Sequence, residues 1–279
     1  MIVRRPAVAG SFYPSDPEEL RASIRDSYTH PLGPGSLPPA KEERKGVLAF
    51  VCPHAGYMYS GPVAAHSYLW ASSLRRPELV VVIGPNHYGV GSGISTFREG
   101  EWATPLGTLQ VDSEAARRMV ELTGIVDFDP ESQRREHSLE VQLPFLQEIY
   151  RTFKILPICL AFQDMETARE LGRGLSVLLK GRDALLVASS DLTHYEPAAV
   201  AREKDTALLE TVKRMDIEGF YRVLEEKAVT ACGYGAIATV MEASRLLGCQ
   251  RGELHKYASS GDTTGDNDAV VGYPSVSFR

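Results

Sequence analysis

The sequence lacks the features that mark proteins of membranes, of secretion and of nucleic acids. Its 279 residues contain no apolar stretch near the roughly 20 residues that span a bilayer. The opening MIVRRPAVAGSFYP has no apolar core of about 7–15 residues, which a secretory signal requires. The formal net charge of -6 gives no basic surface for nucleic acid or anionic lipid. We therefore expect neither a nucleic acid nor a membrane as partner.

Cysteine is also scarce, and its spacing is uninformative. The four cysteines are Cys52, Cys159, Cys232 and Cys249, and none forms a CxxC pair. This spacing argues against a zinc ribbon. Because no export signal is recognisable, we expect reduced thiols and a cytoplasmic location.

Short apolar runs alternate with longer helical patterns along most of the chain. Strands are predicted at residues 46–51, 79–84, 153–161, 184–190, 253–259 and 270–278. Helices are predicted at residues 16–28, 62–74, 113–122, 138–150, 166–179, 197–214, 217–225 and 236–247. The first four strands are apolar throughout, which is typical of strands covered on both faces in parallel sheets. The pattern predicts one α/β domain over residues 1–279, with a central, mostly parallel sheet.

Two polar segments are predicted to be loops. Residues 29–46, THPLGPGSLPPAKEERKG, are rich in Pro, Gly and charge. Residues 260–268, SGDTTGDND, combine Gly and Asp, and their acidic spacing does not fit an EF-hand. A solvated turn is favoured there over a cation site.

Titratable residues follow three of the predicted strands. His54 comes after the first strand in CPHAG, and His87 comes after the second in GPNHYG. The strand at 184–190 continues into DLTHY, which contains Asp191 and His194. In open α/β sheets, ligands bind beyond the carboxyl ends of the strands. Three strand ends that carry such groups therefore predict one site.

Two further segments add residues of the same chemistry. His137 and Glu140 in EHSLEVQLPFL are three apart and would share one helix face. Cys232 in TACGYGAI precedes a predicted helix, whose N-terminus would lower the thiol pKa. Imidazole and thiolate bind transition metals, and carboxylates orient them. Taken singly, each of these residues also has an ordinary structural explanation, such as a buried thiol or a solvated helix face.

These motifs together resemble the MEMO family, whose members are related in fold to the class III extradiol dioxygenases. The matching segments, in order, are RPAVAGSFYP, PHAGYMYSGPVAAHSY, IGPNHYG, EHSLEVQLPFL, SSDLTHY, ACGYGAI and YASSGDTTGD with VGYPSVSF. Each is short, but their number and order over nearly the whole chain make the resemblance specific. It implies a central sheet with helices on both faces and a metal pocket.

The resemblance also implies roles for individual residues. His54 and His87 correspond to two histidine ligands, and Cys232 corresponds to the third ligand of MEMO-like chains. The residues that match the rest of the pocket, with a catalytic or supporting role, are His137, His194, Asp191 and Glu140. The dioxygenases use two histidines and a carboxylate for Fe(II), whereas a thiolate shifts the preference toward Cu(I), Zn or a redox-sensitive iron. We expect iron or copper before zinc.

Three functions remain open from the sequence. The first is a metal-binding protein that acts in redox chemistry, metal handling or recognition of a small-molecule or peptide ligand. For this reading, the resemblance implies phosphotyrosine-peptide binding in animals and a radical-SAM pathway partner in microbes. The second is a non-haem iron dioxygenase, in which His137 or His194 transfers protons. The third is a thiol hydrolase with Cys232 as nucleophile and Asp191 or Glu140 as its carboxylate.

Overall fold

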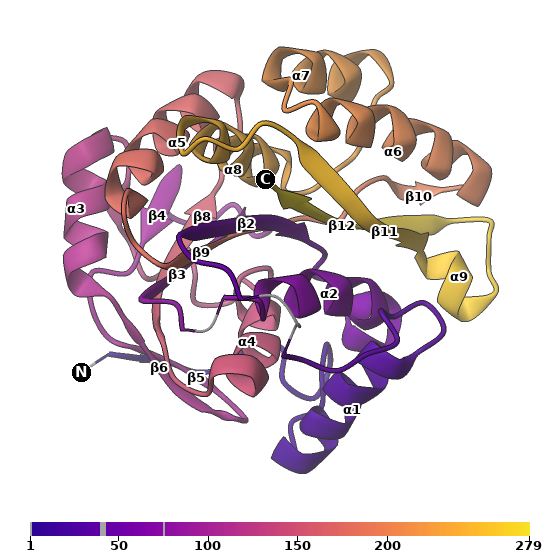
Figure 1. Cartoon of the computed structure of the whole chain (residues 1–279), viewed down its shortest axis with the longest axis horizontal. Coiled ribbons are helices and arrows are strands. Elements are labelled where there is room, and N and C mark those ends of the chain that lie inside the picture. Colours follow the sequence, from indigo (N-terminus) through magenta and orange to yellow (C-terminus); the bar gives the residue numbers. More distant parts are fainter. Residues whose placement is uncertain (1, 40–42, 75) are drawn as a thin grey trace.

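The apolar runs of the sequence form the centre of a mixed sheet (Figure 1). The computed structural model describes residues 2–39, 43–74 and 76–279. Four parallel strands lie side by side in the order β8 (Lys154–Leu160), β3 (Leu79–Pro85), β9 (Ala184–Ser189) and β2 (Val47–Cys52). They coincide with the four apolar runs, so the predicted parallel centre is confirmed.

The sheet continues on both sides of this centre. Beyond β2 lie β12 (Val270–Phe278), β11 (Gly252–Ser259) and β10 (His194–Glu196), each in an antiparallel pair. Beyond β8 lie β6 (Gly107–Val111), β5 (Glu101–Thr104), β1 (Val3–Arg4), β4 (Ile94–Thr96) and β7 (Asp127–Phe128). The sequence predicted β11 and β12 but missed the other edge strands. These are short and lack the apolar run that identified the central strands.

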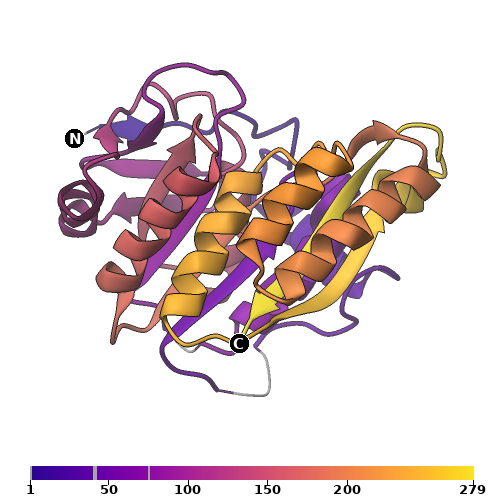
Figure 2. The same ribbon diagram turned by 90° about the horizontal axis from the view of Figure 1, so that it is seen from above.

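Helices cover both faces of the sheet because successive residues of each central strand point to opposite sides. Leu48 and Phe50 of β2 face one layer, and Ala49 and Val51 face the other. The first layer contains α1 (Pro17–Thr29), α2 (Tyr57–Ala71) and α4 (Leu143–Tyr150). The second contains α3 (Ser113–Thr123), α5 (Met165–Leu179), α6 (Ala198–Lys213), α7 (Ile217–Glu226) and α8 (Tyr234–Leu246). Figure 2 shows the salmon-to-gold helices of this second layer in a row across the sheet.

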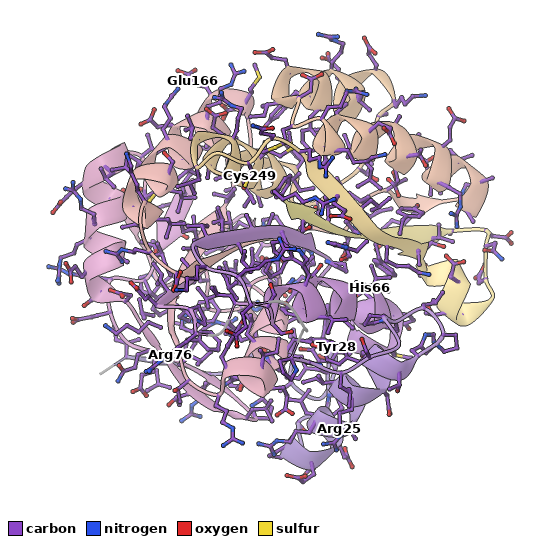
Figure 3. All side chains as sticks on the ribbon, viewed as in Figure 1. Arg25, Tyr28, His66, Arg76, Glu166 and Cys249 are labelled. Carbon is purple, nitrogen blue, oxygen red and sulfur yellow. The ribbon has the colours of Figure 1, made fainter. Side chains whose placement is uncertain are left out.

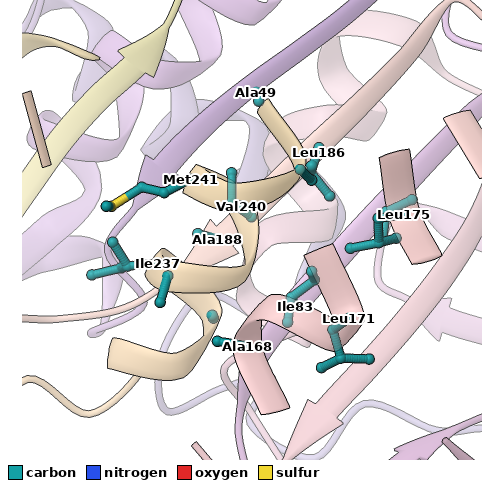
Figure 4. Packing of buried hydrophobic residues seen from close by; sticks show 14 of the residues in the cluster. Ala49, Ile83, Ala168, Leu171, Leu175, Leu186, Ala188, Ile237, Val240 and Met241 are labelled. Carbon is teal, nitrogen blue, oxygen red and sulfur yellow. The ribbon is translucent and has the colours of Figure 1, made fainter. Parts of the chain in front are cut away.

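The second layer packs closely on the sheet and on itself. Ile83 and Leu186 of the strands belong to the same buried cluster as Leu171 of α5 and Val240 of α8 (Figure 4). Full burial of such a side chain stabilises the fold by about 1.5–3 kcal/mol. The approach of α5 to α8 requires Gly172, since a Cβ there would lie 2.6 Å from Cβ of Glu242. The two helices thus pack directly against each other and against the central strands.

Three predicted segments differ from the observed ones. Helix α2 begins at Tyr57 rather than at Pro62, which lies inside the helix although proline usually favours the first turn. The predicted helix at 138–150 divides into a 3₁₀ turn, Glu140–Gln142, and α4. The predicted loop at 260–268 contains the short helix α9 (Ser260–Thr264), which the sequence missed although Ser259 and Asp262 form a capping box.

The proline-rich segment after α1 is consistent with a loop where it is described. In residues 30–39 and 43–46 the only strand-like feature is an isolated bridge between Arg44 and Leu74. Residues 40–42 of the predicted loop lie outside the described part. Over all described residues, no helix combines the length and the apolarity needed to cross a lipid bilayer.

Candidate metal centre

His54, His87 and Cys232 meet at the carboxyl ends of the central strands. His54 follows β2 by two residues, His87 follows β3 by two residues, and Cys232 lies just before α8. Ligand atoms of the three residues all lie within 4.8 Å of one another. They line a cavity of about 890 Å³. The strand ends that the sequence singled out thus converge on one site.

The ring of His54 is held in one tautomer by a buried network. Its Nδ1 lies 2.9 Å from Oγ of Ser189. That hydroxyl donates its proton to the carbonyl of Ser138 at 2.6 Å and accepts from Nε2 of Gln142 at 2.7 Å. Ser189 can therefore only accept from His54, so Nδ1 carries the hydrogen and Nε2 keeps a free lone pair. Burial, followed by the nearby histidines, lowers the pKa of His54 well below its usual value.

A carboxylate that the sequence analysis missed fixes the ring of His87. Oε1 of the buried Glu136 lies 2.9 Å from Nδ1 of His87, and Oε2 accepts the backbone N–H of His87 at 2.7 Å. Burial by itself would raise the pKa of Glu136, but the contacts with His87, His137 and the Ser138 N–H bring it to about 2. Because the carboxylate is ionised, Nδ1 of His87 donates to it, which leaves Nε2 as the ring nitrogen that can bind a metal ion. Carboxylates that orient metal-binding histidines in this way are common. Its only signal in the sequence was its position next to His137.

Cys232 is placed by the close contact of its loop with the end of β9. A Cβ on Gly233 would lie 2.3 Å from the carbonyl oxygen of Ser189, so only glycine fits there. The Sγ atom accepts the backbone N–H of Asp191 at 3.3 Å and lies 3.2 Å from Nε2 of His54. Burial first, and the Asp191 charge second, raise the pKa of this thiol. The predicted lowering of this pKa is therefore wrong for the metal-free protein, because burial disfavours the charged thiolate.

His137 lies against the histidine pair without entering the ligand group. Its ring stacks on His87 with centroids 4.6 Å apart and packs against Phe12 at 4.6 Å. Burial lowers its pKa to about 4 despite the opposing charge of Glu136, so the ring is neutral at pH 7. His87, Glu136 and His137 also present ligand atoms within 4.8 Å, but Nδ1 of His87 already donates to Glu136.

Asp191 and His194 line the same cavity from the segment after β9. Oδ1 of Asp191 accepts the backbone N–H of His54 at 2.8 Å, and burial raises the pKa of this carboxyl to about 6. Nδ1 of His194 lies 3.0 Å from the carbonyl oxygen of Thr230, which can only accept. Nδ1 of His194 is therefore the donor in this contact, and its other ring nitrogen is Nε2.

Glu140 lies outside the cavity, contrary to the prediction. Its Oε2 accepts the backbone N–H of Ala7 at 2.8 Å and pairs with Arg4, and its Oε1 accepts from Val8 and Tyr13. Because His137 lies in non-helical backbone before the 3₁₀ turn at Glu140–Gln142, the two residues share no helix face. The Glu140 carboxylate instead binds the N-terminal segment through these hydrogen bonds and the ion pair.

The other cysteines and histidines have surroundings of a different kind. Cys52 and Cys159 are buried in strands, and Cys249 follows α8 (Figure 3). His66 on α2 bonds the carbonyl oxygen of Leu32 at 2.9 Å, and His255 lies 2.7 Å from Oγ of Ser277. These contacts indicate structural roles for both histidines.

The fold and the site together are those of a protein with a two-histidine, one-cysteine group at the strand ends of an α/β sheet. Residues 4–277 match the family described as Memo-like protein. A MEMO1 family protein of Nitrosopumilus maritimus is 47% identical over 278 residues, covering 99% of this chain and 100% of its own. One of Sulfolobus acidocaldarius is 47% identical over 283 residues, with 99% of both chains covered. The chain belongs to this family.

A solved structure supports the fold at a greater distance. An uncharacterized protein of Escherichia coli K12 superposes with a TM-score of 0.54 at 15% identity. The match covers 85% of this chain and 100% of that one. At this identity the likeness concerns the fold alone.

Proposed function

We propose that this chain is a metalloprotein that holds one transition metal ion on Nε2 of His54, Nε2 of His87 and Sγ of Cys232. The observation that carries the proposal is the pair of fixed tautomers. Ser189 and Glu136 each take an Nδ1 hydrogen, so Nε2 is the nitrogen that both imidazoles present to a metal ion beside the thiol. Such prearranged imidazoles are what metal binding requires.

The donor set suits a borderline or soft ion. Imidazole and thiolate favour copper, iron or zinc over magnesium or calcium. We propose iron or copper first and zinc second, because thiolate and imidazole together bind redox-active ions well. Such an ion, when bound, would supply electron transfer or Lewis-acid chemistry at the cavity.

Metal analysis tests the assignment most directly. We expect about one ion per chain in protein purified without a metal-affinity tag, and its loss in His54→Ala, His87→Ala and Cys232→Ser. His255→Ala is the matched control, because that ring contacts Ser277 away from the cavity. Equal metal content in all four variants would contradict the proposal.

The biological role that we propose is redox chemistry, metal handling or recognition of a small-molecule or peptide ligand in the cytoplasm. The size of the cavity supports a ligand beside the ion, since volumes of about 300–1,000 Å³ are typical of ligand sites. A radical-SAM pathway partner stays a prediction. Co-purification from the native host, compared between the wild type and Cys232→Ser, would test it.

A second candidate is a non-haem iron oxygenase. Two imidazoles at the cavity support it: His137, whose pKa of about 4 makes it neutral at pH 7, and His194, whose Nδ1 is bonded to Thr230 and whose Nε2 has no partner of that kind among the described residues. Either could accept a proton from a bound substrate. Oxygen uptake with catechols after anaerobic iron loading tests the idea, and no uptake under any loading condition would rule it out.

The thiol hydrolase has less support. A nucleophilic thiol needs a lowered pKa and a base that is itself oriented. Burial raises the pKa of Cys232, and the ring of His54 bonds Ser189 rather than a carboxylate. If Cys232 is alkylated rapidly at neutral pH, and at the same rate with and without metal, the result would favour the hydrolase.

A further inference from the structure

The cavity extends beyond the metal-binding group into a part walled by aromatic rings. This aromatic wall consists of Phe12, Tyr59, Tyr195 and Tyr273. Tyr273 is buried on β12 and packs in one cluster with Tyr59 of α2. Tyr195 of β10 lies beside His194 with ring centroids 5.7 Å apart. Rings from four segments that are distant in sequence thus face one space.

Tyr195 has a backbone conformation that suggests a functional constraint. Its φ is 60°, which is unfavourable for a residue with a Cβ. The residue is 78% exposed, so no core packing explains the conformation. The pairing of β10 with β12 shifts register between His194 and Glu196 on either side of it. Strain of this kind is concentrated at ligand sites, and here it holds an aromatic ring at the rim of the cavity.

The described residues that line the cavity include acidic side chains but no lysine or arginine, although the chain contains 30. Its acidic side chains are Asp191 and, from the segment after α9, Asp266. A second cavity of about 620 Å³ is by contrast lined by four arginines and one glutamate, namely Arg4, Arg5, Arg134, Arg135 and Glu131. The lack of cationic side chains therefore distinguishes the cavity beside His54, His87 and Cys232 from this second cavity.

We propose that this cavity selects a ligand that carries an organic ammonium group on an apolar body. The apolar body would pack on the aromatic wall, and the cation would lie near the Tyr195 ring and the Asp266 carboxylate. Cations are attracted to tyrosine faces and to carboxylates, whereas a phosphate or carboxylate would meet no cationic side chain. The proposal names a ligand class for the site of the proposed function and so rests on it.

Three probes of similar size separate charge from shape: phenethylamine, 2-phenylethanol and 3-phenylpropionate. Titration calorimetry at pH 7 should show phenethylamine binding about tenfold more tightly than the other two, consistent with a cation–π contact plus a carboxylate. The titrations are run on metal-free and on metal-loaded protein, because a carboxylate could otherwise bind through the ion. Equal binding of the three probes, or binding of none, overturns the proposal.

Matched variants locate the selectivity. Asp266→Asn should weaken phenethylamine binding about three- to tenfold, while Asp268→Asn, an exposed neighbour that does not line the cavity, should leave it unchanged. Tyr195→Leu should weaken binding and Tyr195→Phe should not, since the ring is retained. If phenethylamine binding is unchanged in Asp266→Asn or in Tyr195→Leu, the assignment of that residue to the ammonium site is overturned. If the protein prefers phenethylamine but takes up no metal, the metal centre is refuted and the ligand class stands. If it takes up metal but does not prefer phenethylamine, the ligand class is refuted and the metal centre stands.

Discussion

Sγ of Cys232 lies 3.2 Å from Nε2 of His54, although the two residues are 178 positions apart. Because Ser189 takes the Nδ1 hydrogen of His54, Nε2 is an acceptor, and the thiol is the donor in this contact. The thiol has two acceptors, Nε2 of His54 and the carbonyl oxygen of Asp191 at 3.7 Å, and donation to the nearer one places its proton between two proposed ligand atoms. A metal ion bound there must displace it.

The first prediction concerns this proton. Burial raises the pKa of Cys232 above its ordinary value, so the thiol is protonated at pH 7 and metal uptake should release about one proton per chain. Affinity should accordingly rise about tenfold per pH unit while the free thiol stays protonated. Calorimetry in buffers of different ionisation enthalpy measures the proton. Uptake without release, at an affinity independent of pH, would exclude a thiolate ligand.

Alkylation gives an independent reading of the same sulfur. Cu(I), Fe(II) or Zn(II) should protect Cys232 from iodoacetamide, while the half-buried Cys249 near the end of α8 stays as reactive as before. Peptide mass spectrometry measures both cysteines in one sample. If none of the three ions protects Cys232, the site consists of histidines without the thiolate.

The second prediction concerns Glu136. Glu136→Gln removes the charge that holds the Nδ1 hydrogen of His87, so metal affinity should fall about 10- to 100-fold while the stoichiometry stays the same. Glu131→Gln is the control, because that side chain is exposed and pairs with Arg134. Competition with a chelator measures the affinities. An unchanged value would show that the carboxylate does not support the ligand.

The sequence predicted the part of the fold that depends on local pattern. Continuous apolar runs identified β2, β3, β8 and β9, and the residues that follow them identified His54 and His87. The short edge strands were missed because pairing, rather than an apolar run, stabilises them. The early start of α2 was missed because proline usually marks the first turn of a helix, so the predicted helix began at Pro62. In the structure Pro62 lies inside the helix, which already begins at Tyr57.

The site was predicted less completely, for the same physical reason. Its ligands are recognisable by residue type, but the groups that orient them are recognisable only by contact. Ser189 and Glu136 gave no separate signal because serine and glutamate are common throughout the chain. Glu140 was misplaced because the spacing argument assumed one helix over both residues, whereas His137 precedes the 3₁₀ turn that begins at Glu140.

The third prediction ranks Asp191 below the ligands. Its carboxylate accepts the backbone N–H of His54, so it positions the loop rather than the ring. Asp191→Asn should weaken metal binding about 10- to 100-fold, whereas His54→Ala should abolish it. Metal content after dialysis against a weak chelator separates the two. Loss as complete as in His54→Ala would make Asp191 a direct ligand.

The fourth prediction follows from the pKa of Asp191, which burial raises from 3.8 to about 6. The folded metal-free protein thus binds this proton more tightly than the unfolded chain, and folding loses stability as pH rises between these values. Above pH 6 the cost is about 3 kcal/mol for a shift of this size. Asp191→Asn carries no such cost, so its unfolding free energy relative to wild type should rise from pH 4 to pH 7. A difference independent of pH would contradict the buried charge.

The fifth prediction concerns the ion pair between Arg4 and Glu140, both of which are buried. The guanidinium also donates to the carbonyl oxygen of Glu136 and lies 4.2 Å from the Trp102 ring centroid. Arg4→Met should cost about 3–5 kcal/mol because it leaves a buried charge without its partner. Arg21→Met should cost less than about 1 kcal/mol, since Arg21 pairs near the surface.

The double variant separates the pair from its surroundings. If Glu140 stabilises the fold mainly through Arg4, Arg4→Met with Glu140→Gln should lose clearly less than the sum of the two single changes. Urea unfolding gives the three free energies, and metal analysis on the folded Glu140→Gln protein should give an unchanged stoichiometry. Additive losses would show that the two charges act independently. Loss of the metal in a folded Glu140→Gln protein would show that Glu140 supports the metal site after all.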